Sequence, residues 1–148
     1  MNRWFVLGCL IFLSSSCFSQ GFLYPWLPQE GNKLKDFLPV DWEIAQQTQG
    51  DLNGDSLPEI AAVIQLKYPV NETIGTDTAA RALHTQPRIL LILVAGKGKH
   101  WKYRLALQNN TFVLRQGEGG LVDDPLQGLS IGNETLSIRF SGGSFNHW

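Results

Sequence analysis

Two apolar stretches of β-forming residues constrain the fold of this chain more than any other feature. Residues 59–66 carry apolar side chains on both alternating faces, and residues 89–94 read Ile-Leu-Leu-Ile-Leu-Val without a break. A strand that is apolar on both faces lies in the interior of a sheet. Neither stretch approaches the roughly 20 apolar residues that a membrane-spanning helix needs. The sequence therefore predicts a sheet that contains 59–66 and 88–95 as buried strands.

Other segments show the two-residue alternation of strands with one wet face. They are residues 42–49, 101–108, 111–115, and a last hairpin of 129–131 with 136–140. Little helix is expected. Asn32 is placed to cap a short helix over residues 33–38 that Pro39 ends. Residues 67–87 form a long connection, with one or two helical turns over 78–83.

These segments together predict a mainly β fold. We expect an antiparallel meander sheet of about six to seven strands with a short N-terminal helix. A closed propeller is excluded because 148 residues cannot supply several four-stranded blades. The side chains expected to be largely buried are Ile60, Ile64, Ile89, Leu91, Leu93, Trp101, Tyr103, Leu105, Ile138 and Phe140.

The N-terminus has the features of a secretory signal peptide. Arg3 precedes a ten-residue apolar run from Trp4 to Leu13, and small residues follow. Cleavage after Ser19 would make Gln20 the first mature residue. The alternative is lipidation at Cys17, because Ser15-Ser16-Cys17 resembles the end of a bacterial lipobox. The chain is therefore predicted to be exported to the periplasm or the extracellular space, with a lipid anchor at Cys17 as the alternative to a free N-terminus.

The sequence divides into three regions. Residues 1–19 are expected to be the cleaved signal peptide. Residues 20–31 are expected to be an extended aromatic and proline-rich tail that packs through Trp26. Residues 32–148 are expected to be a single β domain, shortened at its C-terminus. Both cysteines lie in the signal region, so the folded domain has no thiolate nucleophile and no cysteine zinc ligand.

Charge argues against a nucleic-acid partner. The formal net charge is −1 and gives no global basic field. Basic residues do alternate with aromatic ones over 97–104, but a two-residue period puts them on opposite faces of a strand. The three histidines are scattered, without the spacing of a zinc site.

One loop carries a chemical pattern. Gly50-Asp51-Leu52-Asn53-Gly54-Asp55-Ser56-Leu57-Pro58-Glu59 places oxygen-bearing side chains at loop positions one, three, five and nine. A backbone carbonyl at position seven completes the odd-numbered spacing of a calcium loop. The sequence thus predicts a structural Ca²⁺ site with Asp51, Asn53, Asp55, the carbonyl of Leu57 and Glu59 as ligands. The competing interpretation is an Asx-rich turn that binds nothing.

The same residues resemble the calcium loop of FG-GAP/VCBS-type repeats, and the whole chain resembles single-repeat exported bacterial proteins of unknown function. The resemblance implies calcium binding and a following strand. Two positions depart from the pattern. Ser56 stands at position six, where glycine is usual because the loop turns with positive φ, and this costs about 1 kcal/mol. Ala62 stands at position twelve, where a complete EF-hand loop has a bidentate Glu.

A catalytic alternative uses other carboxylates. Glu118, Asp123 and Asp124 lie in an acidic loop and are candidates for a hydrolase, although turn formation also explains Asp-Asp-Pro. We expect a non-catalytic, exported calcium-binding module. The alternatives are this hydrolase and a structural protein with an empty turn.

Overall fold

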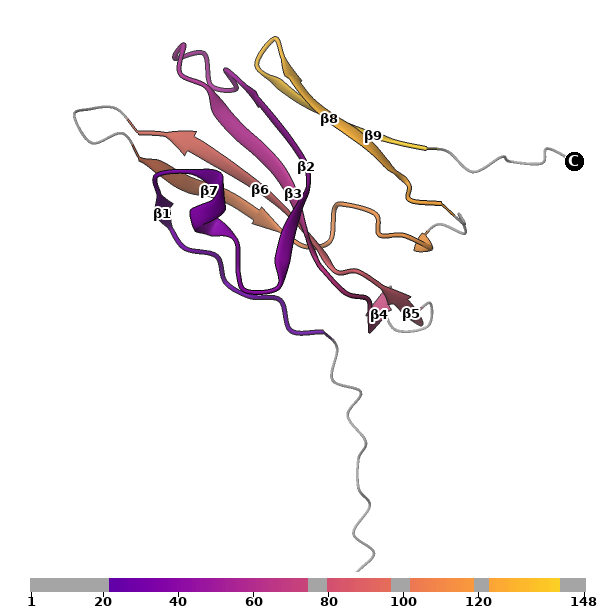
Figure 1. The fold of residues 1–148 in the computed structure, drawn as a ribbon. Coiled ribbons are helices and arrows are strands. Elements are labelled where there is room, and N and C mark those ends of the chain that lie inside the picture. Colours follow the sequence, from indigo (N-terminus) through magenta and orange to yellow (C-terminus); the bar gives the residue numbers. More distant parts are fainter. Residues whose placement is uncertain (1–21, 75–79, 97–101, 119–122, 142–148) are drawn as a thin grey trace, which may run out of the picture.

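The two apolar stretches form adjacent central strands of a five-stranded antiparallel sheet (Figure 1). This computed structural model describes residues 22–74, 80–96, 102–118 and 123–141. The order in the sheet is β1-β7-β6-β3-β2. The bounds are β1 Glu30–Gly31, β2 Trp42–Gly50, β3 Glu59–Leu66, β6 Arg88–Ala95 and β7 Tyr103–Asn109.

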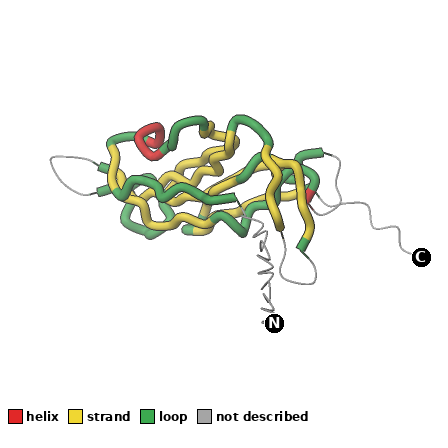
Figure 2. Tube along the Cα trace, turned by 90° about the horizontal axis from the view of Figure 1, so that it is seen from below, coloured by secondary structure: helices red, strands yellow, loops and turns green. Residues whose placement is uncertain are grey.

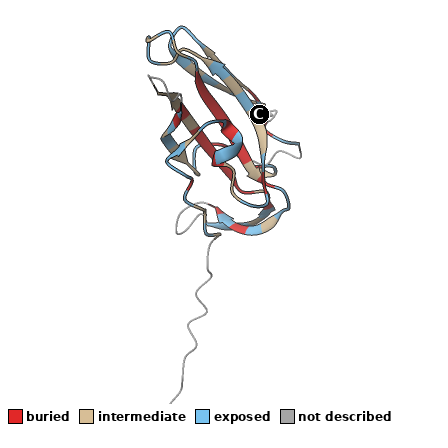
Figure 3. Cartoon of the chain, turned by 60° about the vertical axis from the view of Figure 1, so that its left-hand side comes forward, coloured by how far each residue is buried: buried red, intermediate tan, exposed pale blue. Residues whose placement is uncertain are grey.

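Apolar side chains on both faces of β3 and β6 create two cores. Across the pair, Ile64 lies opposite Ile89 and Ala62 opposite Leu91, and these face one core. Val63 faces the other side. Figure 3 shows β3 and β6 buried in the middle of the molecule.

A different layer covers each face of the sheet. Residues 22–41, here called the N-terminal layer, cover the first face through Leu27, Leu34 and Phe37. The second face is covered by the hairpin of β8 and β9, which places Leu126 in the second core. The hairpin strands are β8 Leu126–Gly132 and β9 Thr135–Phe140.

The mainly β, antiparallel class predicted from the sequence is confirmed, but the prediction of one meander sheet of six to seven strands is wrong. The described residues instead form one five-stranded sheet and two separate two-stranded sheets, β4-β5 and β8-β9. The physical reason lies in the central strands. Because they are apolar on both faces, the last hairpin packs across the second face and does not extend the edge of the sheet.

Residues 67–87 were expected to be a loop with helical turns, and this is also wrong. They contain β4 (Val70–Ile74) and β5 (Arg81–Thr85), which pair antiparallel. In β4, Glu72 and Ile74 are buried while their neighbours are not, which is the burial of a strand. Within the expected helical turns of 78–83, residues 81–83 belong to β5, while 78–79 lie outside the described residues. Strand pairing overrides the local helical preference.

The N-terminal layer differs from prediction in two details. The expected helix over 33–38 is a single 3-10 turn, η1 (Leu34–Phe37), drawn as the red coil in Figure 2. Asp36 accepts hydrogen bonds from the backbone N–H groups of Asn32 at 2.8 Å and Lys33 at 3.2 Å, so an acid inside the turn closes it. Trp26 does not pack on the domain, since it is 91% exposed, and Leu27 is the buried anchor.

The expected short strand at 111–115 is absent. The side-chain oxygen of Asn109 accepts hydrogen bonds from the backbone N–H groups of Thr111 at 3.0 Å and Phe112 at 2.8 Å. This Asx turn bends the chain away from a strand path. Val113 then reaches the second core from a non-regular segment.

The predicted core is confirmed for its central members. Ile60, Ile64, Ile89, Leu91, Leu93 and Tyr103 are buried. Leu105, Ile138 and Phe140 are only half-buried. Trp101, the signal region with Cys17, and the last seven residues lie outside the described residues. In the described part of the chain, no helix is long and apolar enough to cross a membrane.

The burial of Leu91 gives a direct test of the central sheet. Leu91→Ala should lower the free energy of unfolding by about 2–5 kcal/mol, because it leaves a cavity in a fully buried site. Leu107→Ala is the matched control, because Leu107 lies on the neighbouring strand but is 39% exposed. Urea unfolding followed by circular dichroism measures both. Equal losses in the two variants would contradict the assignment of β6 to the centre of the core.

Candidate functional site

The predicted calcium loop joins β2 to β3 at one end of the sheet (Figure 1). Asp51, at the first position of the loop, holds the loop backbone in place. Its carboxylate accepts hydrogen bonds from the backbone N–H groups of Gly54 at 2.7 Å, Asp55 at 3.2 Å and Ser56 at 2.8 Å. An aspartate that collects three backbone donors folds a short loop into a compact turn.

The next two predicted ligands continue this pattern. The side-chain oxygen of Asn53 accepts a hydrogen bond from the Asp55 N–H at 2.9 Å. Asp55 in turn accepts one from the Leu57 N–H at 2.9 Å. Each acceptor lies two residues before its donor, which is the geometry of an Asx turn. The loop backbone is therefore held by the side chains that the sequence assigned to the metal.

Glu59 is the unusual member of the loop. It is the first residue of β3, and it is fully buried. Its carboxylate accepts hydrogen bonds from the Leu52 N–H at 2.8 Å and from the side-chain amide of Asn53 at 3.2 Å. Both donors are neutral, and no cationic side chain of the described residues pairs with it.

The structure thus brings some of the predicted ligands together. Asn53 contacts Glu59, and Asp51 and Asp55 hold the backbone between them. Among the residues that the structure describes, however, no three His, Cys, Asp or Glu side chains are grouped so that they could hold a metal ion. The loop offers the oxygen ligands that a hard cation binds. In this structure its carboxylates accept hydrogen bonds from backbone N–H groups.

A carboxylate that the sequence analysis did not assign also reaches this loop. Glu134 belongs to the turn between β8 and β9, and its side chain lies beside Gly54, where a Cβ would be 3.1 Å from Oε1 of Glu134. The same packing brings Ile131 against Gly50. No sequence signal identifies Glu134, because it approaches the loop only through the packing of β8 on β2.

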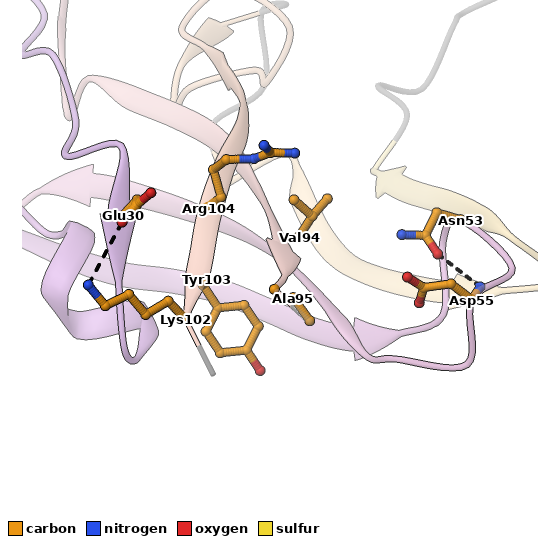
Figure 4. A pocket seen from close by; sticks show the side chains of 9 residues that line it. Glu30, Asn53, Asp55, Val94, Ala95, Lys102, Tyr103 and Arg104 are labelled. Carbon is orange, nitrogen blue, oxygen red and sulfur yellow. Dashed lines mark hydrogen bonds and ion pairs between the residues drawn. The ribbon is translucent and has the colours of Figure 1, made fainter. Parts of the chain in front are cut away.

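The loop also borders a pocket with a volume of about 530 Å³ (Figure 4). Asn53 and Asp55 lie at one end. At the other end Lys102 lies 3.8 Å from the carboxylate of Glu30, with Arg104 nearby. The pocket therefore carries charges of both signs at its rim.

Two of the three alternative acidic residues are bound to two different arginines. Glu118 accepts hydrogen bonds from the backbone N–H of Arg115 at 2.9 Å and from its guanidinium at 3.2 Å. Asp124 forms a two-pronged ion pair with buried Arg88. Asp123 is exposed.

The pKa of Asp124 is lowered from its ordinary value. Its partial burial acts in the opposite direction, but hydrogen bonds from Arg88 and from the Leu126 N–H, with the positive charge of Arg88, outweigh it. These interactions stabilise the charged carboxylate.

A buried polar cluster links distant parts of the chain. Glu72 and Arg115 form an ion pair with an N–O distance of 2.9 Å, and both side chains are almost completely buried. Arg115 also donates a hydrogen bond to the Tyr24 hydroxyl at 2.8 Å, which donates to Glu72 at 2.5 Å. Desolvation, together with the bond to Glu72, raises the pKa of Tyr24 well above its ordinary value. No local sequence pattern identifies this cluster, because its members are spaced more than 40 residues apart.

The comparisons with known proteins found no matching family model, no matching curated protein and no matching solved structure.

The loop backbone gives a prediction about position six. Ser56 has φ of 66°, the left-handed conformation expected there from the sequence. Ser56→Gly should therefore raise the free energy of unfolding by about 0.5–1 kcal/mol, because glycine adopts this conformation without the steric cost of a Cβ. Pro58→Gly, an exposed position two residues on, serves as the control and should not stabilise. Thermal unfolding measures the difference, and a less stable Ser56→Gly protein would contradict the assigned backbone.

The Arg88–Asp124 pair gives a prediction about pH. Because the folded pKa of Asp124 is lowered, its contribution to stability is present above the unfolded pKa of about 3.9 and is lost as pH falls through the folded value. Asp124→Asn should lower the melting temperature at pH 7, and its difference from the wild type should shrink below about pH 4. Asp123→Asn is the control, because no described residue forms an ion pair with that neighbouring carboxylate. A difference that stayed constant with pH would contradict the ion-pair assignment.

Proposed function

We propose that this protein is an exported, non-catalytic β module whose 51–59 loop binds Ca²⁺ as a structural cation. The observation that carries the proposal is the Glu59 carboxylate. It is fully buried, and both of its hydrogen-bond donors are neutral.

A positive charge nearby would stabilise an ionised carboxylate that is buried in this position. Removing an ionised group from water is costly unless it is paired or coordinates a metal. No described basic side chain supplies that charge to Glu59, while the adjacent loop is rich in oxygen ligands. A divalent cation bound in the loop would supply it.

The proposed ligands are Asp51, Asn53, Asp55, the carbonyl of Leu57 and Glu59. Glu134 is an additional carboxylate at the edge of the loop, and it lies where a ligand from outside the loop could take the place of the missing position-twelve glutamate. Binding would require these oxygens to turn from the backbone N–H groups toward the ion. That cost, with the incomplete ligand set, favours a modest affinity of about 10⁻⁴–10⁻³ M.

The export part of the proposal is supported by the charged start, the short apolar run and the small residues that follow it. Calcium is millimolar outside cells, so a modest site is filled there. Two destinations are compatible with this N-terminus: release after cleavage at Ser19, or anchoring through Cys17.

Thermal unfolding with a chelator and with excess calcium tests the metal site. At ten times its dissociation constant, calcium should add about 1.4 kcal/mol to the free energy of unfolding by mass action. Magnesium should substitute poorly, because it holds its waters and demands a tighter octahedron. Asp55→Asn should abolish the calcium effect, and Glu134→Gln should weaken it.

Asp123→Asn serves as the charge-matched control, since it removes one exposed carboxylate far along the chain from the loop. It should leave the calcium effect intact. Calorimetry without any heat of binding at millimolar calcium, together with unchanged melting, would show that the loop is only a turn.

A further inference from the structure

The most exposed large apolar side chains of the described residues lie in the N-terminal layer. Trp26 is 91% exposed, Leu23 is 90% exposed and Val40 is 87% exposed. Leu23 and Trp26 line one shallow depression, together with Phe22, Tyr24 and two amide side chains. An exposed apolar patch of this kind marks an interaction surface.

The backbone explains why these side chains point outward. Pro25 and Pro28 fix the extended conformation of this segment, and a polyproline-type chain repeats every three residues. The burial follows that period. Tyr24 and Leu27, three residues apart, are half-buried and buried, whereas Leu23 and Trp26, also three residues apart, face solvent.

The outward side chains are not needed to hold the layer on the sheet. The Leu27 N–H donates a hydrogen bond to the side-chain oxygen of Gln108 at 3.1 Å. The side-chain N–H of Gln108 in turn donates to the Pro25 carbonyl at 2.7 Å. Ring contacts of Phe22 and Tyr24 with Trp42 fix the start of the layer. The layer is therefore a fixed platform that presents Leu23 and Trp26.

We infer that this platform, defined by Leu23 and Trp26, docks on a lipid bilayer. The inference rests on the export proposed above. The apolar run of residues 4–13 is expected to enter a membrane during export, and Cys17 is the candidate lipid attachment site. Five residues lie between Cys17 and Leu23, so the two are at most about 22 Å apart along the chain. A chain anchored there would hold the platform at the membrane surface.

The chemistry of the platform fits the bilayer interface. Tryptophan is enriched at the boundary between headgroups and acyl chains, where an apolar ring with one polar N–H is best accommodated. A single lipid anchor binds reversibly, so a second apolar contact adds to membrane residence. The exposed charges of the N-terminal layer are of both signs, with Lys33 and Lys35 on one side and Glu30, Asp36 and Asp41 on the other, so the layer carries no basic patch. Binding should therefore need no anionic lipid and should persist in high salt.

The test uses protein purified from cells that express the full chain. Its intact mass reports cleavage or lipidation and so tests export separately from docking. Cosedimentation with phosphatidylcholine vesicles, with and without added phosphatidylglycerol, measures docking. The wild type should bind both kinds of vesicle. The double variant Leu23→Ser/Trp26→Ser should partition at least tenfold more weakly, because burial of each large apolar side chain contributes about tenfold or more.

The matched control is Leu107→Ser/Phe112→Ser. It also replaces one exposed leucine and one exposed aromatic residue, but these line a groove beside β8 and β9 on the opposite side of the sheet. It should bind vesicles like the wild type, and melting curves establish that all three proteins are folded. Equal binding by all three proteins would overturn the inference, because the signal region or an acyl chain on Cys17 would then be sufficient for vesicle binding. Absence of binding by the wild type would overturn it as well, and so would concentration-dependent dimerisation that the first double variant abolishes.

Discussion

The structure depends on one constraint, which is that β3 and β6 are apolar on both faces. Each face must be removed from water, so the sheet needs a layer on each side. The N-terminal layer supplies one through Leu27 and Phe37, and the β8-β9 hairpin supplies the other through Leu126. Segments from the two ends of the described chain are thereby held on opposite faces of one small sheet.

The same constraint positions the candidate metal loop. The loop leaves β2, returns into β3, and has Glu59 as the first residue of the buried strand. Glu59 therefore couples the loop to the core, because a carboxylate held at the end of a buried strand cannot move into solvent without disturbing that strand. The β8-β9 hairpin, placed by the second core, brings Glu134 to the outer side of the loop. The loop and its neighbours form one unit with the centre of the sheet.

Buried charge fixes the other end of the molecule. Arg115 binds Tyr24 of the N-terminal layer and Glu72 of β4, so one guanidinium joins three segments. Arg88 likewise joins the start of β6 to Asp124 in the segment before β8. Arginine suits both places because its planar fork donates several hydrogen bonds at once. These contacts give orientation to layers that apolar burial alone would leave free to slide.

Local sequence patterns predict the mainly β antiparallel class, the bounds of β3 and β6, the burial of five of their residues, and the position of the Asp-rich loop with its left-handed Ser56. Those features follow from local periodicity and turn chemistry, which a short window of sequence contains. Long-range packing alone makes the last hairpin cover a face and not join the sheet, pairs Val70–Ile74 with Arg81–Thr85, and leaves Trp26 facing solvent while Leu27 anchors the layer. It alone brought Glu134 to the loop and Arg115 to Tyr24 and Glu72. These outcomes depend on which distant surfaces must be covered and which distant charges must be paired, and no local pattern carries that information.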